Sequence, residues 1–138
     1  MAHESFPVEV LTPEGKVFDD EVEQISTRTA VGSIGILAHH QPLLGLLEPT
    51  ELRLYKSDSD VVRFAQAEGY VQVARDGSVL LLVEEAVEPD RLNAGDLRDR
   101  LRRAEEAEQA ADEDSEERRR SGRDRRRFEA FLAMAEGG

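Results

Sequence analysis

The sequence predicts a mainly β protein with an α-helical end: an antiparallel β-sandwich or barrel over residues 1–88, then two helices over residues 89–138. Two observations carry this prediction. Up to residue 88, short alternating apolar and polar segments recur every ~8–12 residues with turn signals between them. From residue 90, apolar residues recur at helical spacing instead. The charge shifts at the same point: residues 1–88 hold 16 acidic and 6 basic side chains (net −10), and residues 89–138 hold 14 and 12 (net −2).

The first strands follow from the alternation of side chains. FPVEVLT places Val8 and Val10 on one face, and VEQISTRT alternates in the same way. Between them, PEGK at 13–16 predicts a turn, because Gly15 can adopt a positive φ. These segments therefore predict two or more short strands joined by tight turns.

Three further segments complete the β part. ELRLYK puts Leu52 and Leu54 on one face, and VVRFAQAEGYVQVA predicts one or two strands with Gly69 as a bend or bulge. RDGS at 75–78 is the strongest hairpin signal in the chain, because Asp-Gly suits a primed turn, and VLLLVEE follows it. No helical pattern interrupts these strands before residue 88.

Two helices are predicted at the end of the chain, in an antiparallel hairpin. Asp90 or Asp96 is the expected cap of the first helix. Two highly charged blocks, DEDSEE and RRRSGRDRRR, separate the apolar patterns. The apolar positions at helical spacing are Leu97, Leu101, Ala104 and Ala111 in the first helix, and Phe128, Phe131, Leu132 and Ala135 in the second.

Composition excludes several classes of function. The chain has no cysteine, which excludes disulfides, thiolate metal sites and thiol nucleophiles. Its net charge of −12 opposes nucleic acid as a main partner. We expect no signal peptide, because MAHESFPVEV lacks a basic and an apolar region, and no membrane span, because no run approaches ~18 apolar residues.

The uncharged segment GSIGILAHHQPLLG (32–45) holds the obvious candidates for chemistry, His39 and His40. Adjacent residues in an extended segment point to opposite sides, and no third ligand is nearby, so we expect no metal site. The serines lack a G-x-S-x-G setting, which argues against a hydrolase. GSIGIL has no following Gly-Lys-Ser/Thr to bind phosphate. The carboxylates of FDDEVEQ suit a solvated edge strand better than a cation site.

The arginines at 118–127 leave one alternative open. They predict either a nucleic-acid-binding tail on a free-standing β-sandwich module, or a cluster neutralised by i,i+4 pairing with the acidic run before it. A further hypothesis is a small hydrolase that uses His39 or His40. None of these sites has the full set of groups that its chemistry needs.

Three segments, in this order and spacing, resemble the epsilon subunit of F-type (rotary) ATP synthase: VEVLTPEGKVFDDEVEQIS, GSIGILAHHQPLLGLLEP and EGYVQVARDGSVLLLVEEA. The resemblance is strong over residues 6–88 and looser beyond. Its most specific part is G-x-[IL]-G-[IL] followed by His-x-Pro-[LM], present here as Gly32, Ile34, Gly35 and Ile36, then His40, Pro42 and Leu43. Glu68 departs from the family, because it replaces the first residue of a usual Gly-Gly pair.

The resemblance implies a sandwich of about ten strands that binds the gamma subunit and the c-ring. Ser33 stands where some relatives carry a carboxylate, so no salt bridge is expected there. The glycines would permit close backbone approach, and Ile36 and Leu37 would supply apolar contact. The resemblance implies a loop that docks on the c-ring and the gamma subunit, here called the docking segment: Gly32, Ser33, Ile34, Gly35, Ile36, Leu37, His39, His40 and Pro42.

For residues 89–138 the resemblance implies a regulatory hairpin that swings out to contact the alpha and beta subunits and to block ATP hydrolysis. Some relatives bind ATP through [IL]-D-x-x-R-A. Asp90 and Ala94 match this motif, but Pro89 and Asn93 replace the aliphatic residue and the arginine. Without the guanidinium we expect weak or absent ATP binding and no cofactor. The packing residues expected in the hairpin are Leu97, Leu101, Phe128, Phe131 and Leu132.

The function implied is that of a non-catalytic rotor subunit of the proton-translocating ATP synthase. It would join the gamma subunit to the c-ring, with its helices restraining ATP hydrolysis. The implied location is peripheral, on the cytoplasmic face of the bacterial cell membrane.

Overall fold

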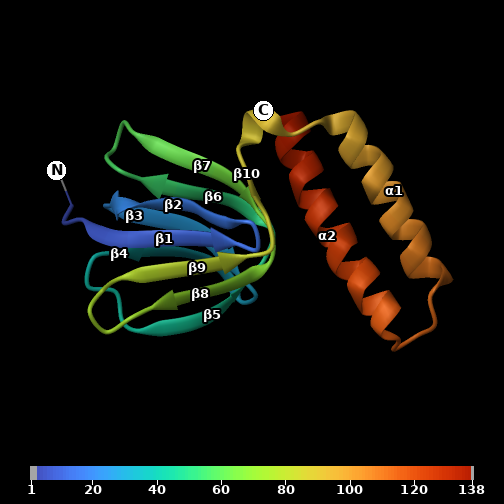
Figure 1. Cartoon of the computed structure of the whole chain (residues 1–138), viewed down its shortest axis with the longest axis horizontal. Coiled ribbons are helices and arrows are strands. Elements are labelled where there is room, and N and C mark those ends of the chain that lie inside the picture. Colours follow the sequence, from blue (N-terminus) through green and yellow to red (C-terminus); the bar gives the residue numbers. More distant parts are fainter. Residues whose placement is uncertain (1–2, 138) are drawn as a thin grey trace. The chain divides into compact units, whose positions relative to one another are not determined.

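The computed structural model describes residues 3–137 and consists of two compact units that divide between Glu88 and Pro89. Figure 1 shows a β unit followed by a helical hairpin, which confirms the predicted fold class. The strands are β1 (Phe6–Thr12), β2 (Gly15–Val22), β3 (Gln24–Thr29), β4 (Gly32–Leu37), β5 (Leu43–Leu47), β6 (Thr50–Tyr55), β7 (Val61–Gln66), β8 (Gly69–Val73), β9 (Val79–Val83) and β10 (Ala86–Val87).

The described strands form one ten-stranded sheet that folds over on itself. Their order is β10-β7-β6-β3-β5-β8-β9-β1-β2, with β4 paired to β3 outside this path. A single pair, Thr29 with Leu47, joins β3 to β5. This narrow junction divides the sheet into a first half (β10, β7, β6, β3, β4) and a second half (β5, β8, β9, β1, β2), which supply the two sides of the core.

The prediction of an entirely antiparallel sandwich is wrong at one pair of strands. β1 runs parallel to β9, with Val8 opposite Val79 and Leu11 opposite Leu82. The remaining strand pairs that we describe are antiparallel. Alternation along a strand gives which face is buried but not the direction of its neighbour, so the sequence pattern could not reveal this pairing.

The core of the β unit is made of inward-facing residues that alternate along the strands. β1 has the burial pattern that the sequence predicts, with Phe6, Val8 and Val10 buried. One polar network lies within this core: Thr27 Oγ1 donates to Gln66 Oε1 at 2.6 Å, and Gln66 Nε2 donates to the Glu48 carbonyl at 2.8 Å. Among residues 3–137, no buried side-chain nitrogen or oxygen lacks a hydrogen-bond partner.

Gly69 is the first residue of β8 and allows a close approach to β9. A Cβ atom there would lie 2.8 Å from Val83 Cα and 2.9 Å from the Leu82 carbonyl carbon, and closer still to the Leu82 oxygen. The position therefore requires glycine for space, where the sequence predicted a bend or bulge. The predicted turn at Gly15 is present, with φ of 129°.

The second unit consists of a short 3₁₀ helix, η1 (Pro89–Arg91), and the helices α1 (Ala94–Ala110) and α2 (Glu116–Gly137). The cap predicted at Asp90 or Asp96 is wrong: Asn93 caps α1, and its Oδ1 accepts a hydrogen bond from the Asp96 amide at 2.9 Å. Asn93 therefore satisfies one of the free amide groups of the first turn. α1 and α2 are antiparallel, because Arg98 pairs with Glu136 and Arg125 with Glu108.

Candidate functional site

The segment 32–42 is half strand and half turn, and not the loop that the sequence suggested. Gly32–Leu37 forms β4, which pairs with β3 from Gln24–Leu37 to Thr29–Gly32. Gly32 has a φ of 132°, a conformation that favours glycine. Gly35 meets no atom closer than 3.9 Å at its missing Cβ, so the backbone of β4 is open to close approach on that side.

The apolar residues of this segment differ in how far they are buried. Ile36, which we expected at the surface, is fully buried and belongs to the core. Its neighbour Leu37 is 44% exposed, and Ile34 is half-buried against the core. The alternation of the strand explains this difference, because successive side chains of β4 point to opposite faces. Ser33 and Pro42 are exposed.

The two histidines lie in the turn that follows β4. His39 has a φ of 66°, and its Nε2 lies 2.6 Å from Glu4 Oε2. His40 Nδ1 donates to the Gln41 carbonyl at 2.8 Å. The two rings thus have separate partners, and within residues 3–137 no group of three His, Asp or Glu side chains could hold a metal ion.

The hairpin has few large buried side chains. Leu97, Ala104 and Phe131 are buried. Leu101, Phe128 and Leu132, which we also expected to pack there, are half-buried. Nearer the α1–α2 connection, Gly122 is buried against the side chain of Glu108. A Cβ atom at Gly122 would lie 2.9 Å from Glu108 Oε2.

Ion pairs also join the two helices. Arg125 Nε lies 2.6 Å from Glu108 Oε1, and Arg125 Nη1 lies 2.9 Å from Glu129 Oε1. Both side chains of the cross-helix pair are less than one-third exposed. The hydrogen bond from Arg125 lowers the pKa of Glu108, and the hydrogen bond to Glu108 raises the pKa of Arg125. At the open end, Arg98 Nη2 lies 2.7 Å from Glu136 Oε2.

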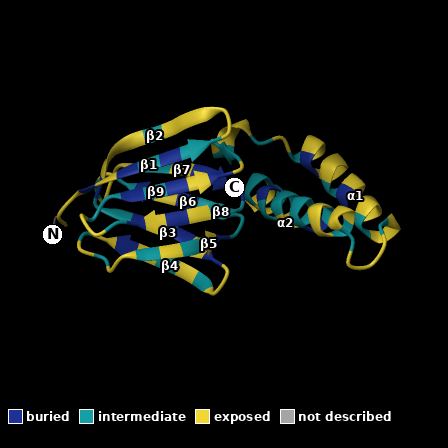
Figure 2. Cartoon of the chain, turned by 60° about the horizontal axis from the view of Figure 1, so that its bottom comes forward, coloured by how far each residue is buried: buried dark blue, intermediate teal, exposed yellow. Residues whose placement is uncertain are grey.

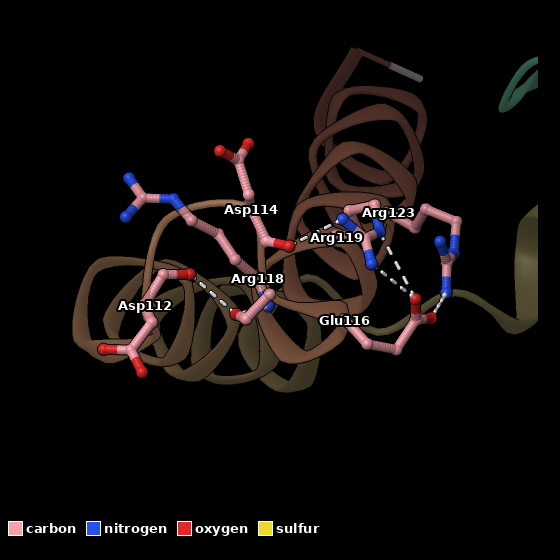
Figure 3. Close-up of polar contacts among 7 residues, drawn as sticks. Asp112, Asp114, Glu116, Arg118, Arg119 and Arg123 are labelled. Carbon is pink, nitrogen blue, oxygen red and sulfur yellow. Dashed lines mark hydrogen bonds and ion pairs between the residues drawn. The ribbon is translucent and has the colours of Figure 1, made fainter.

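The arginines that begin α2 are tied to nearby acidic and carbonyl groups (Figure 3). Arg119 and Arg123 both approach Glu116, at 3.1 and 3.5 Å, and Arg119 Nη1 donates to the Asp114 carbonyl. Arg118 Nη1 donates to the Ala111 carbonyl at 3.3 Å. This pairing agrees with the neutralised cluster and removes the main reason for proposing a nucleic-acid-binding tail.

The residues that correspond to the ATP motif lie at the start of the helical hairpin. Asp90 lies exposed in η1, Asn93 caps α1, and Ala94 begins that helix. An arginine at position 93 would remove the cap. The residue types at 93 and 94 are therefore explained by their place at the start of α1.

The outer face of the second half of the sheet carries a set of exposed apolar side chains that was not predicted from the sequence. Leu44 is 73% exposed, Leu46 54%, Tyr70 52% and Leu82 45%. Figure 2 shows exposed residues alternating with buried ones along β8 and β9. The signal was present in LLGLL and VLLLV, where apolar residues occupy both faces of the strand.

The structure contains no helix in residues 3–137 that is long and apolar enough to cross a membrane.

Residues 5–89 match the model of the family described as ATP synthase, Delta/Epsilon chain, beta-sandwich domain. The ATP synthase epsilon chain of Sulfurihydrogenibium sp. is 36% identical over 130 residues, which cover 94% of this chain and 96% of that protein. The epsilon chain of Persephonella marina is 44% identical over 81 residues, or 59% of each chain.

Two solved structures have the same fold. A chain in the mitochondrial ATP synthase of Euglena gracilis, an assembly of OSCP, F1 and c-ring, superposes with a TM-score of 0.78 at 22% identity, covering 94% of this chain and 80% of that one. A chain in the central stalk and c-ring of the Tetrahymena thermophila enzyme superposes with a TM-score of 0.63 at 16% identity, covering 98% and 99%. Together with the family match, the relative that is similar along both units shows that this chain belongs to the ATP synthase epsilon chain family.

Proposed function

We propose that this chain is a non-catalytic rotor subunit of a proton-translocating ATP synthase. It joins the gamma subunit to the c-ring in the central stalk, and its helices restrain ATP hydrolysis. The supporting observation is the similarity to an epsilon chain along 94% of the chain, because it spans the sandwich and the hairpin alike. The proposed location is peripheral, on the cytoplasmic face of the bacterial membrane.

The docking segment has the character of a contact surface. Within it, Leu37 supplies exposed apolar area, while Gly32 and Gly35 leave the backbone accessible. The segment carries no carboxylate, lysine or arginine from residue 32 to residue 42, so little charge is desolvated on binding. We assign this edge and turn to the c-ring contact.

The hairpin suits a reversible restraint. Its buried large apolar side chains are few, and ion pairs at 2.6 and 2.7 Å join α1 to α2. Two-state elements need a small free-energy gap between their states. In the extended state, the arginines at 118–127 would exchange their present acidic partners for acidic surfaces of the alpha and beta subunits.

Deletion of residues 90–138 tests this function. The truncated chain is expected to assemble into the ATP synthase and to raise its rate of ATP hydrolysis, because the restraint is removed and the docking surface is kept. The full-length chain in the same complex is the control. An unchanged hydrolysis rate in a fully assembled complex would show that the inhibitory role is wrong.

Titration of the isolated chain with ATP tests the degenerate motif. Calorimetry is expected to detect weak binding or none, because position 93 offers a helix cap in place of a guanidinium. Tight binding of ATP would overturn this assignment.

A further inference from the structure

Arg125 has two acidic partners, and they lie on different helices of the hairpin, in which α1 and α2 run side by side (Figure 1). Its Nε lies 2.6 Å from Glu108 Oε1 of α1, and its Nη1 lies 2.9 Å from Glu129 Oε1 of α2 itself. The second contact is an i,i+4 pair, which α2 can keep whether or not α1 is beside it. Arg125 therefore makes one contact that needs the closed hairpin and one that does not.

The pair of Arg125 with Glu108 is more sheltered than the other cross-helix ion pair that we describe. The side chains of Arg125 and Glu108 are 29% and 22% exposed, whereas those of Arg98 and Glu136 are 58% and 47% exposed. Water can hydrate Arg98 and Glu136 as soon as the helices part. A partly buried guanidinium that loses its carboxylate is destabilising unless another acceptor replaces the lost one.

Gly122 explains how Glu108 reaches this position. It is a buried residue of α2, one turn before Arg125, and a Cβ atom there would lie 2.9 Å from Glu108 Oε2. The Glu108 carboxylate therefore lies across bare backbone of α2. Because glycine weakens a helix interior, the contact with Glu108 accounts for its presence in α2 better than the helix alone does.

The cations around Glu108 all belong to α2. The hydrogen bond from Arg125 is the first cause of the lowered pKa of Glu108, and the charges of Arg118 and Arg126 act in the same direction. Separation of the helices removes these cations together, and water then hydrates the Glu108 carboxylate. Glu129 stays beside Arg125 on α2. In the closed hairpin the two carboxylates share one guanidinium, and their like charges repel.

We propose that Arg125 is the switch residue of the hairpin: Glu108 binds it in the closed state, and Glu129 remains its acceptor when α1 separates from α2. Glu129 thereby lowers the free-energy cost of opening, because the guanidinium keeps a carboxylate in both states. The two acids act in opposite directions, Glu108 toward the closed hairpin and Glu129 toward the open one. This inference rests on the proposed function, in which the hairpin opens, and adds the residues that set the balance between its states.

A single buried thiol reports opening in the full chain. The chain has no cysteine, and Ala104 is 7% exposed, one turn before Glu108 on the same face of α1. In Ala104→Cys a thiol reagent reacts when α1 leaves α2, and the labelling rate follows the open population if opening and closing are fast relative to the reaction. Far-ultraviolet circular dichroism checks that each variant keeps its helices.

Glu108→Gln in this background is expected to be labelled about fivefold faster, because the charged hydrogen bond that closes the hairpin is lost. Glu129→Gln is expected to be labelled about twofold slower, because the open state loses its i,i+4 pair and Glu108 loses a competitor for Arg125. Glu116→Gln is the matched control, since the ion pairs of Glu116 with Arg119 and Arg123 lie within α2. It should leave the labelling rate unchanged.

The direction of the change in Glu129→Gln is the critical result. Faster or unchanged labelling in this variant would overturn the proposal, and so would a decrease that Glu116→Gln reproduces. An unchanged rate in Glu108→Gln would overturn it as well, because the closed state would then not depend on that carboxylate.

ATP hydrolysis by the assembled complex separates this inference from the proposed function. If the extended hairpin restrains hydrolysis, Glu108→Gln should lower the hydrolysis rate and Glu129→Gln should raise it. Opposite labelling changes, with hydrolysis unaffected by either variant or by deletion of residues 90–138, would support the switch and refute the restraint. Hydrolysis that rises on deletion, with labelling that does not distinguish the two acids, would support the restraint and refute the switch.

Discussion

Gly69→Ala is expected to destabilise the β unit severely, although it adds a single methyl group. The added Cβ would lie 2.8 Å from Val83 Cα and 2.9 Å from the carbonyl carbon of Leu82. Both are backbone atoms of β9, so no side-chain rotation relieves the clash. β8 and β9 would have to move apart where Gly69 pairs with Val83.

The magnitude follows from the position of the clash. Overpacking in a core costs ~1–3 kcal/mol when side chains adjust. Here paired backbone must move, and we expect a loss of about 3 kcal/mol or more in the free energy of unfolding. At ~4–8 °C per kcal/mol for a domain of this size, the Tm falls by roughly 12 °C or more.

Gly45→Ala provides the matched control on the neighbouring strand β5. Its Cβ would meet the Val71 and Thr29 side chains at 3.5 and 3.7 Å, which is ordinary contact, so its stability should stay within about 1 kcal/mol of wild type. Both tyrosines of the chain, Tyr55 and Tyr70, lie in the β unit, and near-ultraviolet circular dichroism therefore follows its unfolding. Equal Tm values for the two variants would refute the reasoning.

The remaining predictions concern the buried polar network and the hairpin. Gln66→Leu leaves the Thr27 hydroxyl without its partner in the core, and urea titration should show a loss of about 2–3 kcal/mol; no loss would mean that the network does not stabilise the fold. Asn93→Ala removes the cap of α1 and should cost about 1 kcal/mol, seen as faster amide exchange in the first turn, whereas Asn93→Ser should retain most of the protection. The pKa of Glu108 is lowered by Arg125, so this pair stabilises the hairpin above the unfolded carboxyl pKa of ~4.3, and the stabilisation is lost as pH falls through the lower folded value. Far-ultraviolet dichroism should therefore show acid loss of helicity that is weaker in Glu108→Gln, and an identical acid transition in both proteins would contradict the role of the pair.

Much of the fold could be predicted because burial imposes a period on the sequence. The alternation in β1 and the helical spacing of Leu97 and Phe131 depend on which face meets a core, and both patterns are found in the structure. The parallel pairing of β1 and β9 could not be predicted in this way, since it joins residues about 70 positions apart and leaves the alternation unchanged.

The errors at the site have local causes. Ile36 and Leu37 are adjacent and both aliphatic. Because segment 32–42 was predicted as a loop, the alternation of a strand was not applied to it, and their opposite orientations in β4 were not predicted. Asn-x-x-Asp is a cap signal, but Asp90 and Asp96 are N-cap candidates of similar strength by residue type, so residue type alone did not single out Asn93. The exposed leucines of β5 and β9 were not predicted, because leucines on both sides of a strand resemble an ordinary buried strand.

The most direct test of the central claim is the composition of the complex that this chain forms with the gamma subunit of its own ATP synthase. The two purified proteins should sediment together as a one-to-one complex with no activity of its own. If the chain sediments alone beside native gamma, or turns over a substrate unaided, the assignment as a rotor subunit is contradicted.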